Sequence, residues 1–109
     1  MLNPVVKSID VLEFNKRYHQ SPLTIIDVRE PTEWDAGHIP KAIHIPKDSI
    51  KSCIQEKCPD FSQPLYLYCK GGVRSLYAAQ LLNELGYREV YSVDGGFLAW
   101  MEHGFDVMV

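Results

Sequence analysis

The chain has 109 residues, of which 46% are hydrophobic and 23% are charged. This length and composition predict one compact domain over residues 1–109, with no second core elsewhere in the chain. The formal net charge of −3 and the pI near 5.7 argue against nucleic acid or an anionic membrane as a partner, because both would favour a basic protein face.

Two further features bear on where the protein acts. Neither end of the chain carries an apolar run of 18 residues, and the start, Met1 to Pro4, lacks a basic stretch followed by an apolar one. These observations predict a soluble, unexported protein in the cytoplasm. The cysteines are odd in number, which predicts reduced thiols rather than a disulfide framework for Cys53, Cys58 and Cys69.

The first half of the chain alternates helix and strand signals. Asp10 and Glu13 have the spacing of a capping box, which predicts a short helix ending near His19. The run from Leu23 to Val28 is rich in β-branched residues and predicts a strand buried on both faces of a parallel sheet. After it we expect a short helix over residues 30–36, a turn over 37–40 and a strand over 42–45.

The second half continues the alternation. The segment from Lys47 to Lys57 is helix-like and ends before Pro59. Strands are predicted over 65–69 and 90–93, and helices over 75–85 and 97–103, each helix being stopped by a glycine. This pattern predicts an α/β fold, a three-layer sandwich in which a mainly parallel central sheet is flanked by helices.

In an open α/β sheet, the ligand crevice lies beyond the carboxyl ends of the strands. Asp27 and Cys69 both lie at the carboxyl end of a predicted strand. Arg29 and the turn over residues 94–96 can reach the same edge. We therefore expect the pocket at this edge.

The stretch CKGGVRS, residues 69–75, places a thiol in a loop that opens onto a helix start. Unpaired backbone N–H groups and the helix dipole favour an anion there, and Lys70 and Arg74 add two cations. Gly71 and Gly72 can turn N–H groups inward because they lack a Cβ atom. A thiol pKa lowered from roughly 8.5 to about 6.5 would raise the thiolate population at neutral pH roughly twentyfold.

These features predict that Cys69 is a nucleophile, whereas an ordinary turn holding a buried cysteine is the structural alternative. The residues expected to form an anion cradle around it are Lys70, Gly71, Gly72, Val73, Arg74 and Ser75.

The loop resembles the active-site loop of the rhodanese family of sulfurtransferases. Residues 23–46, LTIIDVREPTEWDAGHIPKAIHIP, resemble the family's Asp-x-Arg-x-x-x-Glu-(aromatic) stretch and its Gly-His-Ile-Pro turn. Residues 90–107, VYSVDGGFLAWMEHGFDV, resemble its closing strand, Asp-Gly-Gly turn and Trp-bearing helix. The three motifs follow the expected order over about eighty residues, and the resemblance covers nearly the whole chain. One departure is Lys41, where the family commonly has glycine, and we expect an altered turn there because lysine at positive φ costs about 1 kcal/mol.

The resemblance implies a thiosulfate sulfurtransferase without a metal or organic cofactor. The Cys69 thiolate would attack the outer sulfur of a small anionic donor such as thiosulfate, and sulfite would leave. An acceptor, which could be cyanide, a thiol or a protein, would then remove the sulfur from the Cys69 persulfide. Lys70 and Arg74 would neutralise the donor's charge, and Ser75 would cap the following helix. Lys70 favours an inorganic donor or a protein persulfide over mercaptopyruvate.

Two other functions stay open. A cysteine-dependent phosphatase or arsenate reductase would use the same thiolate, but phosphatase loops place five residues between cysteine and arginine, and here four separate Cys69 from Arg74. A non-catalytic binding or regulatory module could retain the fold, although the intact cysteine, lysine and arginine argue against it.

The remaining polar residues are interpreted structurally. We expect Asp27 and Arg29 to form an ion pair that braces the loop rather than to move protons. We expect His38 to hold its turn through a hydrogen bond to the backbone. Cys53 and Cys58 form no redox motif and are interpreted as packing or surface thiols, the alternative being resolving thiols. A metal site is not expected, because no ligand spacing occurs among His19, His44 and His103.

Overall fold

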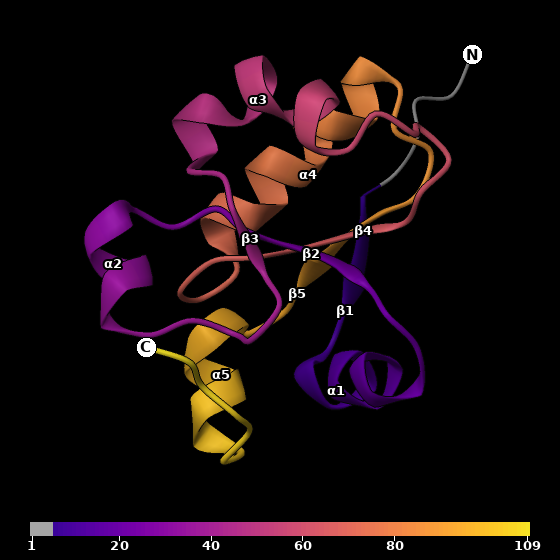
Figure 1. Ribbon diagram of the computed structural model, residues 1–109. Helices are drawn as coiled ribbons and strands as arrows, with labels where there is room; N and C mark the ends of the chain where they lie inside the picture. The colour runs from indigo at the N-terminus through magenta and orange to yellow at the C-terminus, as the bar shows by residue number, and fades with distance from the viewer. Residues whose placement is uncertain (1–5) are drawn as a thin grey trace.

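The computed structural model describes residues 6–109, and a parallel β-sheet lies at its centre (Figure 1). The sheet has five strands in the order β1-β5-β4-β2-β3, and every neighbouring pair is parallel. The strands are β1 Lys7–Ile9, β2 Thr24–Asp27, β3 Ile43–His44, β4 Leu65–Tyr68 and β5 Val90–Val93. The helices are α1 Val11–Gln20, α2 Pro31–Ala36, the 3-10 helix η1 Lys47–Ser49, α3 Ile50–Lys57, α4 Val73–Leu85 and α5 Gly96–Glu102.

The helices cover both faces of the sheet, which confirms the predicted three-layer α/β fold. In Figure 1, α3 and α4 lie above the sheet and α1 and α5 lie below it. Successive residues of a strand point to opposite faces, so Ile26 and Leu67 join the core between the sheet and α3 and α4, whereas Ile25 and Tyr66 join the core between the sheet and α1 and α5. Burial on both faces explains the nearly continuous apolar runs.

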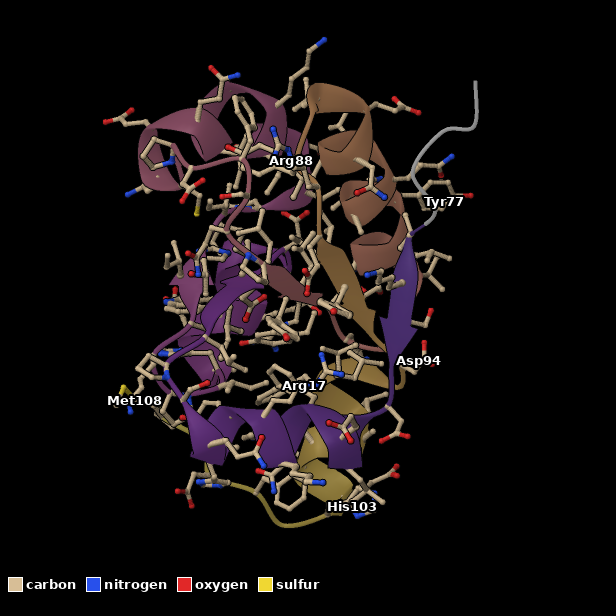
Figure 2. The ribbon with its side chains drawn as sticks, turned by 90° about the vertical axis from the view of Figure 1, so that its right-hand side faces the viewer. Arg17, Tyr77, Arg88, Asp94, His103 and Met108 are labelled. Atoms are coloured by element: carbon tan, nitrogen blue, oxygen red, sulfur yellow. The ribbon has the colours of Figure 1, made fainter. Side chains whose placement is uncertain are left out.

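The α1 layer also contributes a polar contact. Arg17 points from α1 toward the sheet (Figure 2), and its Nη1 donates to Tyr66 Oη at 3.1 Å. On the solvent side, Arg17 pairs with Glu13 at 3.0 Å. Asp10 is the N-cap of this helix, and its Oδ1 accepts from Glu13 N at 2.8 Å, but the Glu13 carboxylate accepts from Arg17 rather than completing the predicted capping box.

β1 was not predicted from the sequence. Lys7 and Ser8 are exposed and only Ile9 is buried, so this short edge strand carries no apolar run. Its conformation comes from pairing with β5, where Ile9 lies opposite Val93. Strand formation here depends on a distant neighbour, which a local pattern does not reveal.

The Gly-His-Ile-Pro turn keeps a left-handed residue at its end. Lys41 adopts a φ of 73°, the region that favours glycine. The expectation of an altered turn is therefore wrong, because Lys41 adopts the left-handed conformation despite its strain. His38 Nδ1 lies 3.1 Å from the Trp34 carbonyl oxygen, as expected for a residue that holds the turn, and His38 forms an antiparallel bridge with Met108.

Within residues 6–109, every helix is too short or too polar to cross a lipid bilayer.

Candidate active site

Cys69 directly follows β4, in the loop that leads into α4. This loop lies between α2 and α5 (Figure 1). The Cys69 side chain is buried, with 1% of the residue exposed. Its Sγ accepts a hydrogen bond from the Gly72 N–H at 3.0 Å and lies 3.6 Å from Ser75 Oγ. The thiol therefore sits at the base of the loop, with donors directed at it.

The pKa of Cys69 reflects two opposing effects. Burial raises the pKa, but hydrogen bonds from the Ser75 side chain and from the backbone N–H groups of Ser75, Gly72 and Gly71 outweigh burial and lower it. The direction agrees with the predicted thiolate. The largest effects that lower the Cys69 pKa are hydrogen bonds, whereas the predicted causes included the charges of Lys70 and Arg74.

Gly72 is the N-cap of α4 and has a φ of 111°. This left-handed conformation turns its N–H toward Cys69 and starts the helix at Val73, two residues earlier than predicted. Ser75 therefore lies in the first turn, and its predicted role as the cap is wrong. Val73 is 69% exposed, and the groups that donate to Cys69 belong to Gly71, Gly72 and Ser75 rather than to Val73.

Ser75 connects the thiol to β5. Its Oγ lies 3.1 Å from the Gly72 carbonyl oxygen and 2.8 Å from Ser92 Oγ. Ser75 donates its single hydroxyl proton to the Gly72 carbonyl oxygen, and when Ser92 donates to Ser75, rotation of the Ser75 hydroxyl directs that proton to the Cys69 thiolate instead. Ser92 was not among the predicted site residues, although a serine inside the apolar strand Val90–Val93 is a usable signal.

Replacing Ser75 by alanine is expected to raise the pKa of Cys69, because one hydrogen bond to the thiolate is lost. Since less thiolate is then present, alkylation of Cys69 by iodoacetamide at pH 7 should slow roughly tenfold, and the midpoint of rate against pH should move upward. Peptide mass mapping separates Cys69 from the other thiols. Ser52→Ala, an exposed serine on α3, is the control. An unchanged midpoint in Ser75→Ala would contradict the assignment.

Arg74 does not present an uncompensated charge. Its Nη1 and Nη2 donate to Glu33 Oε1 and Oε2 of α2 at 2.5 and 2.8 Å. This bidentate pair lowers the pKa of Glu33 to about 2 and raises the pKa of Arg74. By contrast, Lys70 is exposed and has no salt bridge among residues 6–109. Two available cations were expected in the loop, but only Lys70 is available, because Arg74 is paired with Glu33.

Asp27 and Arg29 form the expected ion pair behind the loop. Arg29 Nη2 lies 2.7 Å from Asp27 Oδ2 and also donates to the Gly37 carbonyl oxygen at 2.7 Å. Both side chains are almost fully buried. The guanidinium carbon lies 4.3 Å from the ring centre of Phe97. The pair therefore joins β2, the turn at Gly37 and α5.

The Asp94-Gly95-Gly96 turn brings α5 against the loop backbone. Phe97 N donates to the Cys69 carbonyl oxygen at 2.8 Å, and Leu98 N donates to the Lys70 carbonyl oxygen at 3.0 Å. Gly96 has a φ of 55°, and a Cβ atom there would lie 2.4 Å from the Cys69 carbonyl oxygen. The turn was predicted to lie at the pocket, but the close approach at Gly96 was not predicted.

A cavity of about 290 Å³ opens beside the loop. Its lining combines charged groups with apolar side chains, and Phe97, Leu98 and Met101 of α5 provide the apolar part. The charged lining residues are Arg29, Glu33 and Lys70. The predicted edge of the sheet thus holds the thiol and an adjoining pocket.

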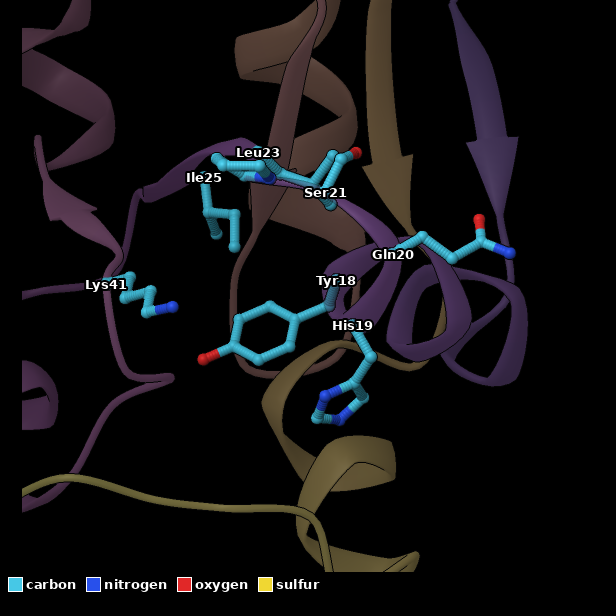
Figure 3. Close-up of a pocket in the computed structure, with 8 residues that line it drawn as sticks. Tyr18, His19, Gln20, Ser21, Leu23, Ile25 and Lys41 are labelled. Carbon is cyan, nitrogen blue, oxygen red and sulfur yellow. The ribbon is translucent and has the colours of Figure 1, made fainter.

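A second cavity, of about 300 Å³, lies between the end of α1 and the start of β2 (Figure 3). Lys41 enters from one side, and Tyr18 and His19 from the other (Figure 3). None of residues 69–75 lines it. This cavity is therefore separate from the candidate active site.

The other thiols do not join the loop. Cys58, at the end of α3, is buried in the core under α4, and burial raises its pKa. Cys53 is half-buried and packs against the same core. Their interpretation as packing thiols agrees with this placement. In the described part of the chain, no group of three or more His, Cys, Asp or Glu side chains lies close enough to hold a metal ion.

Comparisons with known proteins agree with this arrangement. The family model for the rhodanese-like domain matches residues 10–103. A crystal structure of a rhodanese-like domain protein from Staphylococcus aureus is 32% identical, with a TM-score of 0.79 over 95% of this chain and 100% of that chain. A rhodanese-related protein from Thermoplasma volcanium is 30% identical, with a TM-score of 0.79 over 94% of this chain and 97% of that one. The chain belongs to the rhodanese-like domain family.

The fold also occurs in a protein described as a possible tyrosine phosphatase, from Rhodopseudomonas palustris. That structure has a TM-score of 0.82 and 24% identity, and the match covers 94% of this chain and 85% of that chain. At this identity the similarity concerns the fold alone. The shared fold does not assign a function, because function depends on the residues of the loop.

Proposed function

We propose that the protein is a sulfurtransferase that moves a sulfane sulfur through a persulfide on Cys69. The observation that carries this proposal is the Cys69 Sγ, which accepts the Gly72 N–H at 3.0 Å beneath a loop with four residues between cysteine and arginine. Donors aimed at the sulfur stabilise a thiolate, and they can stabilise a persulfide anion in the same way. A loop of this length suits one added sulfur rather than a phosphate group.

The reaction has two displacement steps. The Cys69 thiolate attacks the outer sulfur of a donor such as thiosulfate, the donor's sulfur–sulfur bond breaks, and sulfite leaves with the electron pair. A thiolate acceptor or cyanide then attacks the terminal sulfur of the persulfide, and the Cys69 thiolate leaves. Asp27 and Arg29 take no part in this scheme, because both displacements use thiolates and need no proton from them, and their ion pair joins β2, the turn at Gly37 and α5.

The proposed cofactor requirement, partners and location follow from the composition of the chain and of the site. Each step uses only the thiolate and backbone or hydroxyl donors, so neither a metal nor an organic cofactor is required. With a formal net charge of −3, neither nucleic acid nor a membrane is a proposed partner, and the proposed location is the cytoplasm. The partners are a small anionic sulfur donor and an acceptor that is cyanide, a thiol or a protein.

The test is intact mass spectrometry of the reduced protein after incubation with thiosulfate. We expect a gain of one sulfur atom, its loss on addition of cyanide, and no gain in Cys69→Ala. An unmodified protein whose Cys69 alkylates rapidly would favour another donor or the phosphatase, and a site that is both unmodified and unreactive would favour a binding module.

A further inference from the structure

Glu33 adds a negative charge to a site that is otherwise cationic. Glu33 lines the cavity beside the loop together with Lys70 and Arg29. Both carboxylate oxygens accept from Arg74, so the only arginine of the loop is already neutralised. Glu33 is ionised at all ordinary pH values, because the pair with Arg74 lowers its pKa to about 2.

The charge count of the site follows from the ion pairs. Arg29 is paired with Asp27, and Arg74 is paired with Glu33. Lys70 is therefore the one cation of the cavity that has no carboxylate partner among residues 6–109. A donor that approaches the Cys69 thiolate encounters about one compensating positive charge.

Candidate donors differ in the negative charge that they bring. Attack of the thiolate on thiosulfate places a dianion beside a monoanion, a total charge of −3. Attack on a neutral organic hydropersulfide keeps the total charge at −1. In this step the Cys69 sulfur bonds to the terminal sulfur, the donor's sulfur–sulfur bond breaks, and an organic thiolate leaves with the electron pair. A site with one uncompensated cation suits the second case.

The cavity also suits an organic donor in shape and polarity. Its volume is about 290 Å³, and Phe97, Leu98 and Met101 line it with apolar surface. Leu98 and Met101 are 41% and 44% exposed. An apolar body attached to the leaving sulfur would cover these side chains, whereas thiosulfate has no apolar part that could do so.

We propose that Glu33 is a specificity-determining residue that selects organic hydropersulfides with an apolar body over dianionic donors. This inference rests on the proposed sulfurtransferase function and names the donor class for the same site. Glu33 acts through Arg74. Its carboxylate neutralises the Arg74 guanidinium, so that positive charge is not available to bind a dianionic donor.

Glu33→Gln isolates this effect. Glutamine keeps an amide oxygen that can accept from the Glu30 N–H, which Glu33 Oε1 now accepts at 2.9 Å, and from Arg74. The start of α2 is therefore retained, whereas the negative charge and the acceptor of Arg74 Nη2 are removed. Glu13→Gln is the matched control, because it removes the carboxylate partner of Arg17 on α1, away from the loop.

The experiment follows sulfuration of Cys69 by rapid quench and intact mass, with thiosulfate and with benzyl hydropersulfide as donors, over a range of concentrations. In the wild type, we expect benzyl hydropersulfide to react at lower concentration. In Glu33→Gln, the thiosulfate concentration giving half-maximal rate should fall roughly tenfold, and benzyl hydropersulfide should change less than about twofold. The thiosulfate gain should shrink at high ionic strength. Glu13→Gln should leave both donors unchanged.

Two results would overturn the inference while leaving the sulfurtransferase function intact. These are an unchanged thiosulfate dependence in Glu33→Gln, and an equal change for both donors, which would indicate a structural effect. If neither donor sulfurates the wild type, the proposed function itself fails, and the inference fails with it.

Discussion

Asp27→Asn is expected to destabilise the protein by about 3–5 kcal/mol, because it leaves the Arg29 guanidinium buried without its counter-charge. Arg29 is 3% exposed and lies against Phe97. Chemical denaturation should therefore show a lower midpoint with an unchanged slope. Because the same pair braces the turn beside the loop, sulfuration of Cys69 should also slow.

Two variants make this prediction specific. Glu13→Gln breaks the exposed Arg17–Glu13 pair and should cost less than about 1 kcal/mol. The double change of Asp27→Leu with Arg29→Met removes both buried charges and should recover part of the loss. A loss below about 1 kcal/mol in Asp27→Asn would show that the buried guanidinium finds other compensation.

Gly96→Ala is expected to displace the active loop. The added Cβ atom would lie 2.4 Å from the Cys69 carbonyl oxygen and 2.7 Å from that of Lys70, and the residue has a φ of 55°. Steric overlap with backbone atoms and left-handed strain together should cost about 2–4 kcal/mol. Since the hydrogen bonds from Phe97 and Leu98 to the loop would be disturbed, the sulfuration rate should fall about a hundredfold.

Gly104→Ala separates the overlap from the strain. Gly104 has a φ of 73°, but apart from its two chain neighbours no residue has a heavy atom within 4 Å of the position that a Cβ atom would take there. Its alanine variant should lose only about 1–2 kcal/mol and keep the sulfuration rate. Denaturation curves and Cys69 sulfuration rates of the two variants provide the comparison. Equal rates in both would mean that the loop tolerates a shift of α5.

The parts of the fold that could be predicted have signals within a few neighbouring residues. The apolar runs of β2 and β4 reflect burial on both faces, and the helix ending at Lys57 is followed closely by Pro59. β1 was missed because its strand conformation comes from pairing with β5 rather than from its own residues. α4 begins two residues earlier than predicted, because Gly72 adopts a left-handed conformation and is the N-cap.

The sequence by itself determined the α/β alternation, the position of Cys69 at a helix start, and the candidate cradle, because each depends on residues adjacent along the chain. The tertiary structure alone decided which charges of that cradle are available. Arg74 meets Glu33, 41 positions away, and Ser75 meets Ser92, 17 positions away. Such contacts depend on how α2 and β5 pack around the loop, and a local pattern carries no information on the distance between two side chains from separate elements.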